Sequence, residues 1–281
     1  MAALNAPMPG GDWQAARGAM VRGMNEDRRI EGHGTPDAAW QAWGGLSALP
    51  RIDAATLAPP GGRAIIVAPH PDDEVLACGG LMQLLRAQGT RTVLLAVTDG
   101  DASHPGSTLL PPAKLARLRP NETQAALHAL GVHSGDAGPM STQILRARLA
   151  DGQVRAHIDQ LQNLLHQLLR PDDVVFVTWR QDGHPDHEAC GLAAAMAARA
   201  CRATLVEMPV WSWHWAAPGD SRLPWRRACR LDLAPDIMQR KRDAVHCFQT
   251  QLQGDSSTGQ AAILPPHVLA RLLHPYEIYF T

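Results

Sequence analysis

Residues 63–74 read RAIIVAPHPDDE, an apolar run that leads directly into a histidine and three acidic residues. The first six residues, RAIIVA, are almost continuously apolar and rich in β-branched side chains, which is typical of a parallel strand buried on both faces. In open α/β sheets, ligands bind just beyond the carboxyl ends of the strands. The stretch therefore predicts a central strand with a functional loop at its end.

The same pattern recurs along the chain and indicates the fold class. Three further buried strands are predicted, at 91–97 (RTVLLAV), 173–179 (DVVFVTW) and 204–210. Helical spacing of apolar residues predicts helices at 81–88, 114–130, 154–169, 188–200, 239–249 and 267–273, and a last strand at 277–280. We expect Pro120 to kink or divide the second of these helices. This alternation is typical of a three-layer, Rossmann-like, doubly wound α/β fold with a mainly parallel sheet.

Length and charge limit the domain organisation and the binding partners. We expect residues 61–281 of the 281-residue chain to form one catalytic domain, and residues 1–60 to form an N-terminal extension that packs on it. The Pro/Gly-rich run at 59–62 marks the boundary. A formal net charge of −1 gives no electrostatic footprint for nucleic acid or an anionic membrane. The predicted partner is instead a small molecule.

Cysteine usage and hydropathy predict the compartment. The five cysteines are scattered singly and form no C-x-x-C pair. No run of about 18 apolar residues suggests a membrane span, and the N-terminus lacks the apolar core of a secretion signal. We therefore expect a cytoplasmic protein without a membrane span, which could be a homo-oligomer.

A second acid/histidine cluster, QDGHPDH at 181–187, follows the strand predicted at 173–179. Two such clusters at the ends of core strands can converge in one cleft. A catalytic zinc site takes three ligands from histidine and carboxylate and keeps one position for water. A spare carboxylate can then accept the water's proton, and a spare imidazole can polarise a carbonyl group. An isolated Asp-Asp or His-Pro is usually only a turn or a loop, so the pairing of the clusters is what indicates the metal site.

Both clusters carry a family resemblance. AIIVAPHPDDEVLACGG (64–80) and HPDHEACG (184–191) resemble the PIG-L/LmbE-like N-deacetylases. Similarity extends to VTDG (97–100), to the R-x-x-E helix at 119–122 and to KRDAVHCFQTQ (241–251), and so covers about residues 60–251. The resemblance implies a zinc-dependent hydrolase, with another divalent metal as an alternative. It would remove an N-acyl group, most simply acetyl, from an amino sugar conjugate such as an N-acetylglucosaminyl compound.

The resemblance also assigns the metal ligands and the base. His70 and Asp73 would bind zinc from the first motif, and His187 from the second. Asp72 would be the general base that takes a proton from water. For Glu74 we favour a supporting role at a helix start over a ligand role, because acidic groups suit helix N-termini.

The second motif supplies the remaining catalytic groups. His184 would stabilise the tetrahedral oxyanion or protonate the departing amine, and Asp186 would orient His184 or sustain its charge. Some family members have a tyrosine two residues before the first histidine of H-P-D-H, where this chain has Asp182. Help for the oxyanion must therefore come from His184 and the metal.

The substrate-binding residues are less sharply indicated. The resemblance points to Arg119 and Asp136 as groups that hold the sugar, with a surface ion pair and a turn residue as equally good alternatives. Trp211 and Trp213 belong to an aromatic segment that suits a sugar ring, and packing at a dimer contact or under the N-terminal extension explains it equally well. For Lys241 and its neighbouring arginines we favour a solvated helix face over an anion site.

Two alternatives to the main hypothesis remain open. The same metal machinery would serve an amidase for another acyl group or conjugate. A non-catalytic nucleotide- or sugar-binding module is less favoured, because no G-x-G-x-x-G follows the first strand. A second metal at Asp99, Asp101 and His104 is also disfavoured, since nothing else is predicted to converge there.

Overall fold

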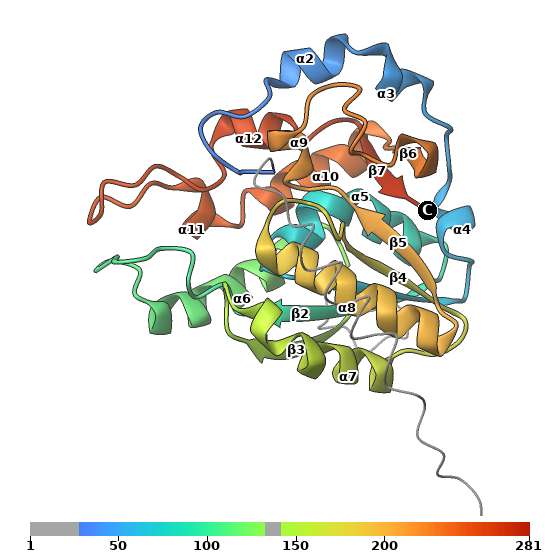
Figure 1. Cartoon of the computed structure of the whole chain (residues 1–281), viewed down its shortest axis with the longest axis horizontal. Helices are drawn as coiled ribbons and strands as arrows, with labels where there is room; N and C mark the ends of the chain where they lie inside the picture. The colour runs from blue at the N-terminus through green and yellow to red at the C-terminus, as the bar shows by residue number, and fades with distance from the viewer. Residues whose placement is uncertain (1–27, 133–141) are drawn as a thin grey trace, which may run out of the picture.

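The computed structural model describes residues 28–132 and 142–281 (Figure 1). The described residues are built around one seven-stranded sheet with the order β3-β2-β1-β4-β5-β7-β6. Its strands are β1 (Arg63–Ala68), β2 (Arg91–Thr98), β3 (Gln143–Leu149), β4 (Asp173–Thr178), β5 (Thr204–Met208), β6 (Ala228–Asp232) and β7 (Tyr276–Phe280).

The sheet is mainly parallel, as predicted. β1 lies inside the sheet, between β2 and β4, and both pairings are parallel. β2 and β3 are also parallel, as are β4 and β5, whereas β7 runs antiparallel to both β5 and β6. The predicted fold class, a doubly wound α/β sheet, is confirmed.

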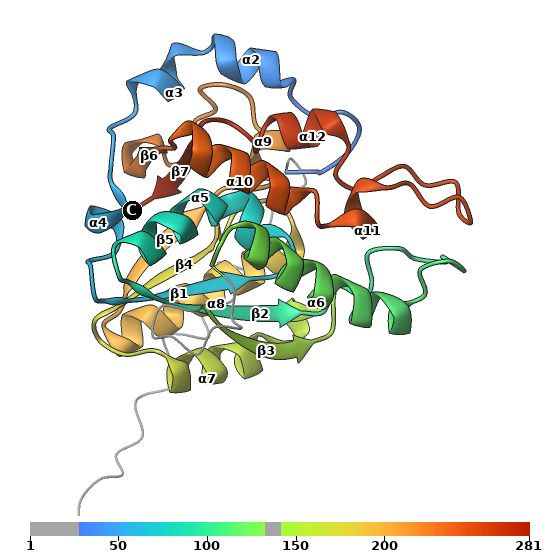
Figure 2. The same ribbon diagram turned by 180° about the vertical axis from the view of Figure 1, so that it is seen from behind.

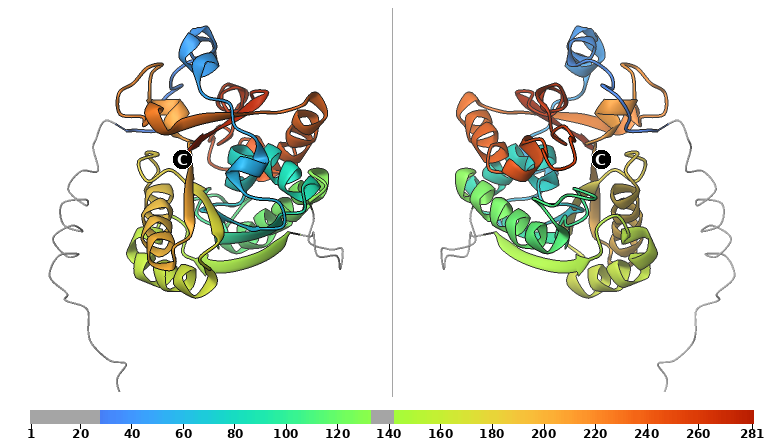
Figure 3. Two further views of the ribbon diagram at one scale, coloured as in Figure 1. Left: turned by 90° about the vertical axis from the view of Figure 1, so that its right-hand side faces the viewer. Right: turned by 90° about the vertical axis from the view of Figure 1, so that its left-hand side faces the viewer.

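Helices cover both faces of the sheet. The described residues form the helices α2 (Asp37–Ala42), α3 (Gly44–Ala48), α4 (Ala54–Leu57), α5 (Asp73–Ala87), α6 (Pro112–Ala129), α7 (Ile158–Leu168), α8 (Pro185–Cys201), α9 (Ser212–Trp215), α10 (Pro235–Val245), α11 (Gln249–Leu252) and α12 (Pro266–Ala270), with 3-10 turns η1 (Val154–His157) and η2 (Trp225–Arg227). α7 and α8 lie in front of the sheet in Figure 1, and α5, α6 and α10 lie in front of it in Figure 2. Viewed along the sheet in Figure 3, the two groups of helices form separate outer layers. None of the described helices is both long and apolar enough to cross a bilayer.

Pro120 does not divide its helix. α6 continues from Pro112 to Ala129 with Pro120 inside it. A proline removes one backbone hydrogen bond from a helix. Burial of the surrounding positions, among them Leu115, Thr123 and Leu127, holds the helix against the sheet despite that loss.

α5, which begins at the functional loop, is kinked, and a buried carboxylate fills the kink. Cys78 leaves the helical conformation, with φ −143° and ψ 23°. Glu277 of β7 accepts hydrogen bonds there from the backbone N–H groups of Gly80 (2.7 Å) and Leu81 (2.9 Å). Lys241 Nζ donates to the same carboxylate at 2.7 Å and is fully buried. The expected solvated position of Lys241 is therefore wrong, because its charge is neutralised inside the protein.

The described part of the N-terminal extension lies against the core. Trp40 of α2 is 1% exposed and donates a hydrogen bond from Nε1 to the carbonyl oxygen of Trp213. Its ring packs edge-on against Trp213, with the ring centroids 5.0 Å apart, and also contacts Trp43 and Trp225. The boundary at residue 60 stays a prediction, since residues 1–27 lie outside the described residues.

Candidate metal centre

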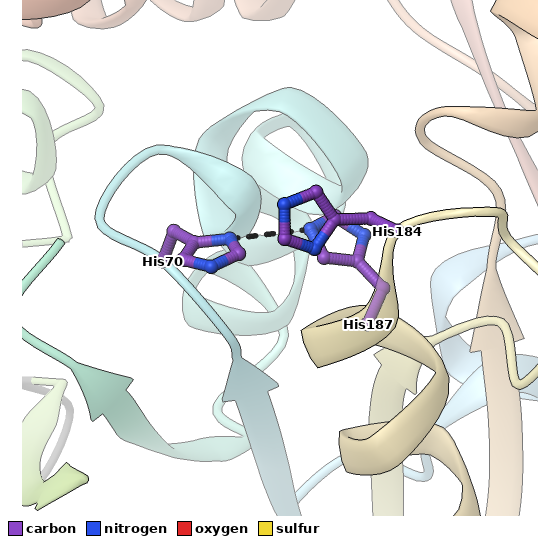
Figure 4. A group of neighbouring side chains, drawn as sticks. All are labelled: His70, His184 and His187. Carbon is purple, nitrogen blue, oxygen red and sulfur yellow. Dashed lines mark hydrogen bonds between the residues drawn. The ribbon is translucent and has the colours of Figure 1, made fainter. Parts of the chain in front are cut away.

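The two acid/histidine clusters meet where the sheet reverses its winding direction. β1 and β4 are parallel neighbours, so their carboxyl ends lie side by side. The loop after β1 leads into α5 on one face of the sheet, and the loop after β4 leads into α8 on the other. Open α/β sheets form their ligand-binding crevice at such a point. The loops bring His70 and His187 into contact, as Figure 4 shows.

Three potential ligand atoms form a small triangle. His70 Nδ1 lies 3.3 Å from His187 Nε2 and 3.3 Å from Asp73 Oδ2. The third side, from His187 Nε2 to Asp73 Oδ2, is 3.2 Å. In a tetrahedral site with zinc–ligand bonds of about 2.0–2.1 Å, neighbouring ligand atoms lie about 3.3–3.4 Å apart. The three atoms are therefore spaced as ligands of one tetrahedral cation would be.

The charges around these imidazoles favour a bound cation. Burial lowers the pKa of His70, but its hydrogen bonds with Asp151 and Asp186 outweigh burial and raise that pKa well above the usual value. Burial likewise lowers the pKa of His187, and the neighbouring Asp73 raises it to about 9. Both shifts mean that the buried carboxylates stabilise positive charge at this point. A metal ion would supply that charge in place of the protons.

Carboxylates behind His70 set its tautomer. His70 Nε2 lies 3.2 Å from Asp151 Oδ1 and 3.2 Å from Asp186 Oδ2. Since ionised carboxylates only accept hydrogen bonds, Nε2 carries the proton and Nδ1 keeps its lone pair for a metal. Asp186 also accepts from the backbone N–H groups of Gly152 (2.7 Å) and Val154 (3.0 Å). Its carboxylate thus contacts His70, and its backbone N–H donates to His184. Burial lowers the pKa of His184, but the charge of Asp186 acts to raise it, so the predicted support of the His184 charge stays a prediction.

Asp182 performs the same task for His187. Its Oδ2 accepts a hydrogen bond from His187 Nδ1 at 2.9 Å, which leaves Nε2 free to bind a metal. The backbone N–H groups of residues 210–212 also donate to this carboxylate, at 2.9–3.0 Å. Sequence reasoning assigned no role to Asp182 or Asp151. Asp182 lies inside the second motif, whereas Asp151 follows β3, a strand that was not predicted.

Asp72 is held in a strained conformation beside the triangle. Its φ of 130° lies in a region that residues other than glycine rarely adopt. Its backbone N–H donates to Glu74 Oε2 at 3.1 Å, and Arg119 donates to its Oδ2 at 3.2 Å. Burial raises the pKa of Asp72 to about 8, against the opposing charge of Arg119. Burial thus raises the proton affinity of this carboxylate, and a general base works best with a pKa near the operating pH.

His184 is held as a neutral imidazole. It is the N-cap residue of α8, and its Nδ1 accepts a hydrogen bond from the backbone N–H of Asp186 at 3.2 Å. Nδ1 therefore carries no proton, and the proton of the neutral ring sits on Nε2. Burial, together with His187 and His70, lowers the pKa of His184 to about 3. In this state His184 can donate a hydrogen bond but does not carry an extra proton near neutral pH.

A cavity of about 380 Å³ opens above these groups. Its lining includes the polar groups of His70, Asp72, Asp73 and His184. Apolar residues also line it, namely Leu76, Val210, Trp211, Ile263, Leu264 and Leu272. The site thus combines polar groups with an apolar surface.

The predicted substrate-binding residues differ in whether they line this cavity. Arg119 and Trp211 line the cavity, and the guanidinium of Arg119 also donates to the carbonyl oxygens of Gly100 and Pro71. Trp213 is 8% exposed, packs against Trp40 and is not among the cavity-lining residues. The prediction for Trp213 is therefore wrong, because its ring belongs to the core. Asp136 lies outside the described residues.

The disfavoured second metal site gains no support among the described residues. Asp99 pairs with Arg146, and His104 contacts the neighbouring Ser103 hydroxyl group. Elsewhere, potential ligand atoms of His70, Asp151 and Asp186 lie within 4.8 Å of one another. These two carboxylates are already used to orient His70, as described above.

Comparisons with known proteins agree with this geometry. Residues 65–198 match the PIG-L family model, described as GlcNAc-PI de-N-acetylase. A 1D-myo-inositol 2-acetamido-2-deoxy-alpha-D-glucopyranoside deacetylase from Corynebacterium glutamicum is 32% identical over 146 residues, which are 45% of this chain and 49% of the relative. The corresponding deacetylase from Corynebacterium urealyticum is 33% identical over 148 residues, which are 44% of each chain. The chain thus matches about half the length of these curated relatives.

Solved structures show the same fold. A conserved protein from Thermus thermophilus has a TM-score of 0.50 and 22% identity, over 74% of this chain and 84% of that chain. A deacetylase of an antimicrobial pseudoaglycone also has a TM-score of 0.50 and 22% identity, over 68% and 83%. The matched segment contains both acid/histidine motifs. Residues 65–198 are therefore similar to the PIG-L family, in the segment that carries both motifs.

Proposed function

We propose that this protein is a zinc-dependent hydrolase that removes an N-acyl group, most simply acetyl, from an amino sugar conjugate such as an N-acetylglucosaminyl compound. The observation that carries the proposal is the triangle of His70, Asp73 and His187 ligand atoms, with sides of 3.2–3.3 Å, beside the carboxylate of Asp72. Two nitrogen ligands and one oxygen ligand are a typical catalytic zinc set. The Corynebacterium relatives act on an acetamido sugar, which supports the substrate class.

Zinc in this triangle would lower the pKa of a coordinated water to about 7 and polarise a carbonyl group. Asp72 would accept the proton of the attacking water and later deliver it to the departing amine. His184 would donate a hydrogen bond from Nε2 to the carbonyl oxygen as negative charge develops on it. The pKa of His184, lowered to about 3, supports this role over that of a proton donor to the amine. Another divalent metal with the same preference for nitrogen and oxygen remains the alternative to zinc.

The cavity supports a substrate with both polar and apolar parts. Its volume of about 380 Å³ lies at the lower end of the range for small-molecule sites. Trp211, Leu264 and Leu272 give the cavity an apolar surface, suited to a sugar face or a partly apolar aglycone. The same surface would also suit an acyl group other than acetyl, which is the alternative amidase function.

The five cysteines are all free thiols. Free thiols are usual in reducing compartments, which supports the expected cytoplasmic location.

The test is an amine-release screen with metal-free and zinc-reconstituted full-length protein. The substrates are N-acetylglucosamine conjugates that carry inositol, malate, lipid or glycopeptide aglycones, each paired with a longer-chain acyl analogue. We expect zinc-dependent amine release from at least one acetyl conjugate. Release only from the longer acyl analogues would favour the amidase alternative. If no substrate were hydrolysed although zinc bound stoichiometrically, the proposed function would be rejected.

A further inference from the structure

A buried ion pair links the N-terminal extension to the second metal motif. Arg28 donates from Nε to Glu188 Oε1 at 3.2 Å, and its Nη2 atom lies 3.1 Å from the same oxygen. The two side chains are only 10% and 7% exposed. Glu188 follows the ligand His187 directly in α8. A residue 160 positions away in sequence thus reaches the first turn of the helix that carries the site.

The same carboxylate oxygen holds the backbone of the catalytic loop. Glu188 Oε1 accepts a hydrogen bond from the backbone N–H of Gly183 at 3.1 Å. Gly183 directly precedes His184, so this bond fixes the approach of the chain to the imidazole. Arg28 neutralises the carboxylate that makes the bond.

The loop is also closely packed at Gly183. Its φ is +96°, and a Cβ atom here would lie 2.7 Å from the carbonyl oxygen of Arg28 and 2.7 Å from Trp215 Nε1. Trp215 Nε1 in turn donates to the carbonyl oxygen of Asp182 at 2.7 Å. The backbone of Arg28 and the ring of Trp215 therefore both pack closely on Gly183, where a side chain would not fit.

The segment that carries Arg28 is held in place over several residues. Arg271 donates from Nη1 to the carbonyl oxygens of His33 (3.0 Å) and Thr35 (2.8 Å). Thr35 also bonds through its backbone N–H to the carbonyl oxygen of His214 and through its hydroxyl group to that of Ala216. In Figure 1 this stretch, drawn in blue before α2, runs toward α9. The backbone that carries Arg28 is thus held in place close to the loop.

We propose that Arg28 is a positioning residue for His184, acting through Glu188 and Gly183, and this inference rests on the proposed hydrolase function. Without the guanidinium, Glu188 would be a buried charge with no cationic partner, which is strongly unfavourable. Glu188 would turn toward water and release the Gly183 N–H. The metal ligands would stay in place, because His70 and Asp73 come from another loop and Asp182 holds His187. Removal of the Arg28 guanidinium should therefore lower turnover more than it lowers metal affinity.

The experiment compares Arg28→Ala and Arg28→Lys with Arg29→Ala, all in the zinc-loaded full-length protein. Arg29 is the matched control, because it is the neighbouring arginine and pairs with Glu31 at the exposed surface. Three quantities are measured: kcat and KM for the best conjugate of the screen, zinc affinity by chelator competition, and hydrogen exchange of peptides that cover residues 180–190. The exchange measurement needs no substrate, so it tests the link even if the proposed function fails.

For Arg28→Ala we expect kcat to fall roughly 10- to 100-fold, a loss typical of changes behind the metal ligands, with KM and zinc affinity within threefold of wild type. Exchange should accelerate in peptides 180–190 and not in those of the β1 loop. Arg28→Lys should restore part of kcat, and Arg29→Ala should match wild type. Unchanged kcat and unchanged exchange in Arg28→Ala would overturn the proposal. So would a fall in zinc affinity as large as the fall in kcat, because the residue would then support the metal ligands.

Discussion

At the scale of single residues, Asp182 supports the proposed ligand His187. In Asp182→Asn, one acceptor oxygen can keep its bonds to the N–H groups of Val210 and Ser212. The new amide group would then face two other donors, His187 Nδ1 and the N–H of Trp211. Because His187 loses the partner that sets its tautomer, we expect zinc affinity to fall about 10- to 100-fold. Chelator competition measures this, and an unchanged affinity would contradict the role given to Asp182.

Substitutions at Asp72 and at His187 should affect turnover and zinc binding differently. Asp72→Asn removes the proton acceptor but leaves the three ligand atoms untouched, so zinc content should stay stoichiometric while kcat falls about 10²- to 10⁴-fold. His187→Ala removes a ligand and should lose both zinc and turnover. Zinc content by atomic absorption and kcat by amine release give the two readouts. Full turnover in Asp72→Asn would show that another group takes the proton.

The meeting of His70, Asp73 and His187 could be predicted from sequence because each lies in a short motif at the end of a buried strand. The contact between Asp186 and His70 could not be predicted, since adjacency to His184 in sequence says nothing about where the carboxylate points. The role of Asp182 depends on backbone N–H groups at 210–212, which only the folded chain brings close. Partners of this kind are set by tertiary structure and leave no local pattern.

At the scale of elements, Glu207 ties β5 to the segments beside it. Its fully buried carboxylate accepts from Arg180, which follows β4, and from Arg227 of η2. Burial raises the pKa of Glu207, but the hydrogen bonds from Arg180 outweigh burial and hold it below the ordinary 4.5. A folded pKa below the unfolded value means that the contribution to stability is complete above about pH 4.5 and is lost as the pH falls through the folded pKa.

We therefore expect Glu207→Gln to lower the free energy of unfolding by about 1–3 kcal/mol at pH 7. The difference between wild type and variant should stay constant down to about pH 5 and shrink below pH 4.5. Denaturant unfolding at a series of pH values measures it. Asp236→Asn, which breaks an exposed pair with Arg240, is the control and should change little. A difference that grew as the pH fell would refute the sign of the shift.

Sequence predicted the buried elements well and the edge elements poorly. β1 has the predicted bounds, and β2, β4 and β5 lie within two residues of theirs, because their apolar runs have no other explanation than burial on both faces. β3 and β6 were not predicted. β3 is an edge strand whose positions are mostly half-buried or exposed, and it contains Arg146 and Arg148. Edge strands tolerate charge, so they lack the apolar run that identifies a central strand.

At the scale of the whole molecule, the functional loops are enclosed by parts that lie far apart in sequence. The loop after β1 leads into α5, whose kink is held by Glu277 near the C-terminus. The loop after β4 is held by Arg28 near the start of the described chain and by Trp215. The motifs predict which residues react, but these supports come from outside the matched segment 65–198. The extension and the C-terminal elements are therefore expected to fold together with the domain as one unit.

Trp40 tests that expectation. Its ring is 1% exposed and contacts Trp213 and Trp225, so Trp40→Ala removes apolar contacts between the extension and the core. A large-to-small change of this kind typically costs about 3–5 kcal/mol. If residues 28–60 belong to the cooperative unit, the whole protein should unfold at a lower denaturant concentration in one transition, with the slope unchanged. Trp43→Ala, at a half-buried position of the same cluster, is the matched control and should cost less. A separate early transition for the extension, with the main one unmoved, would instead show that the extension folds apart from the sheet.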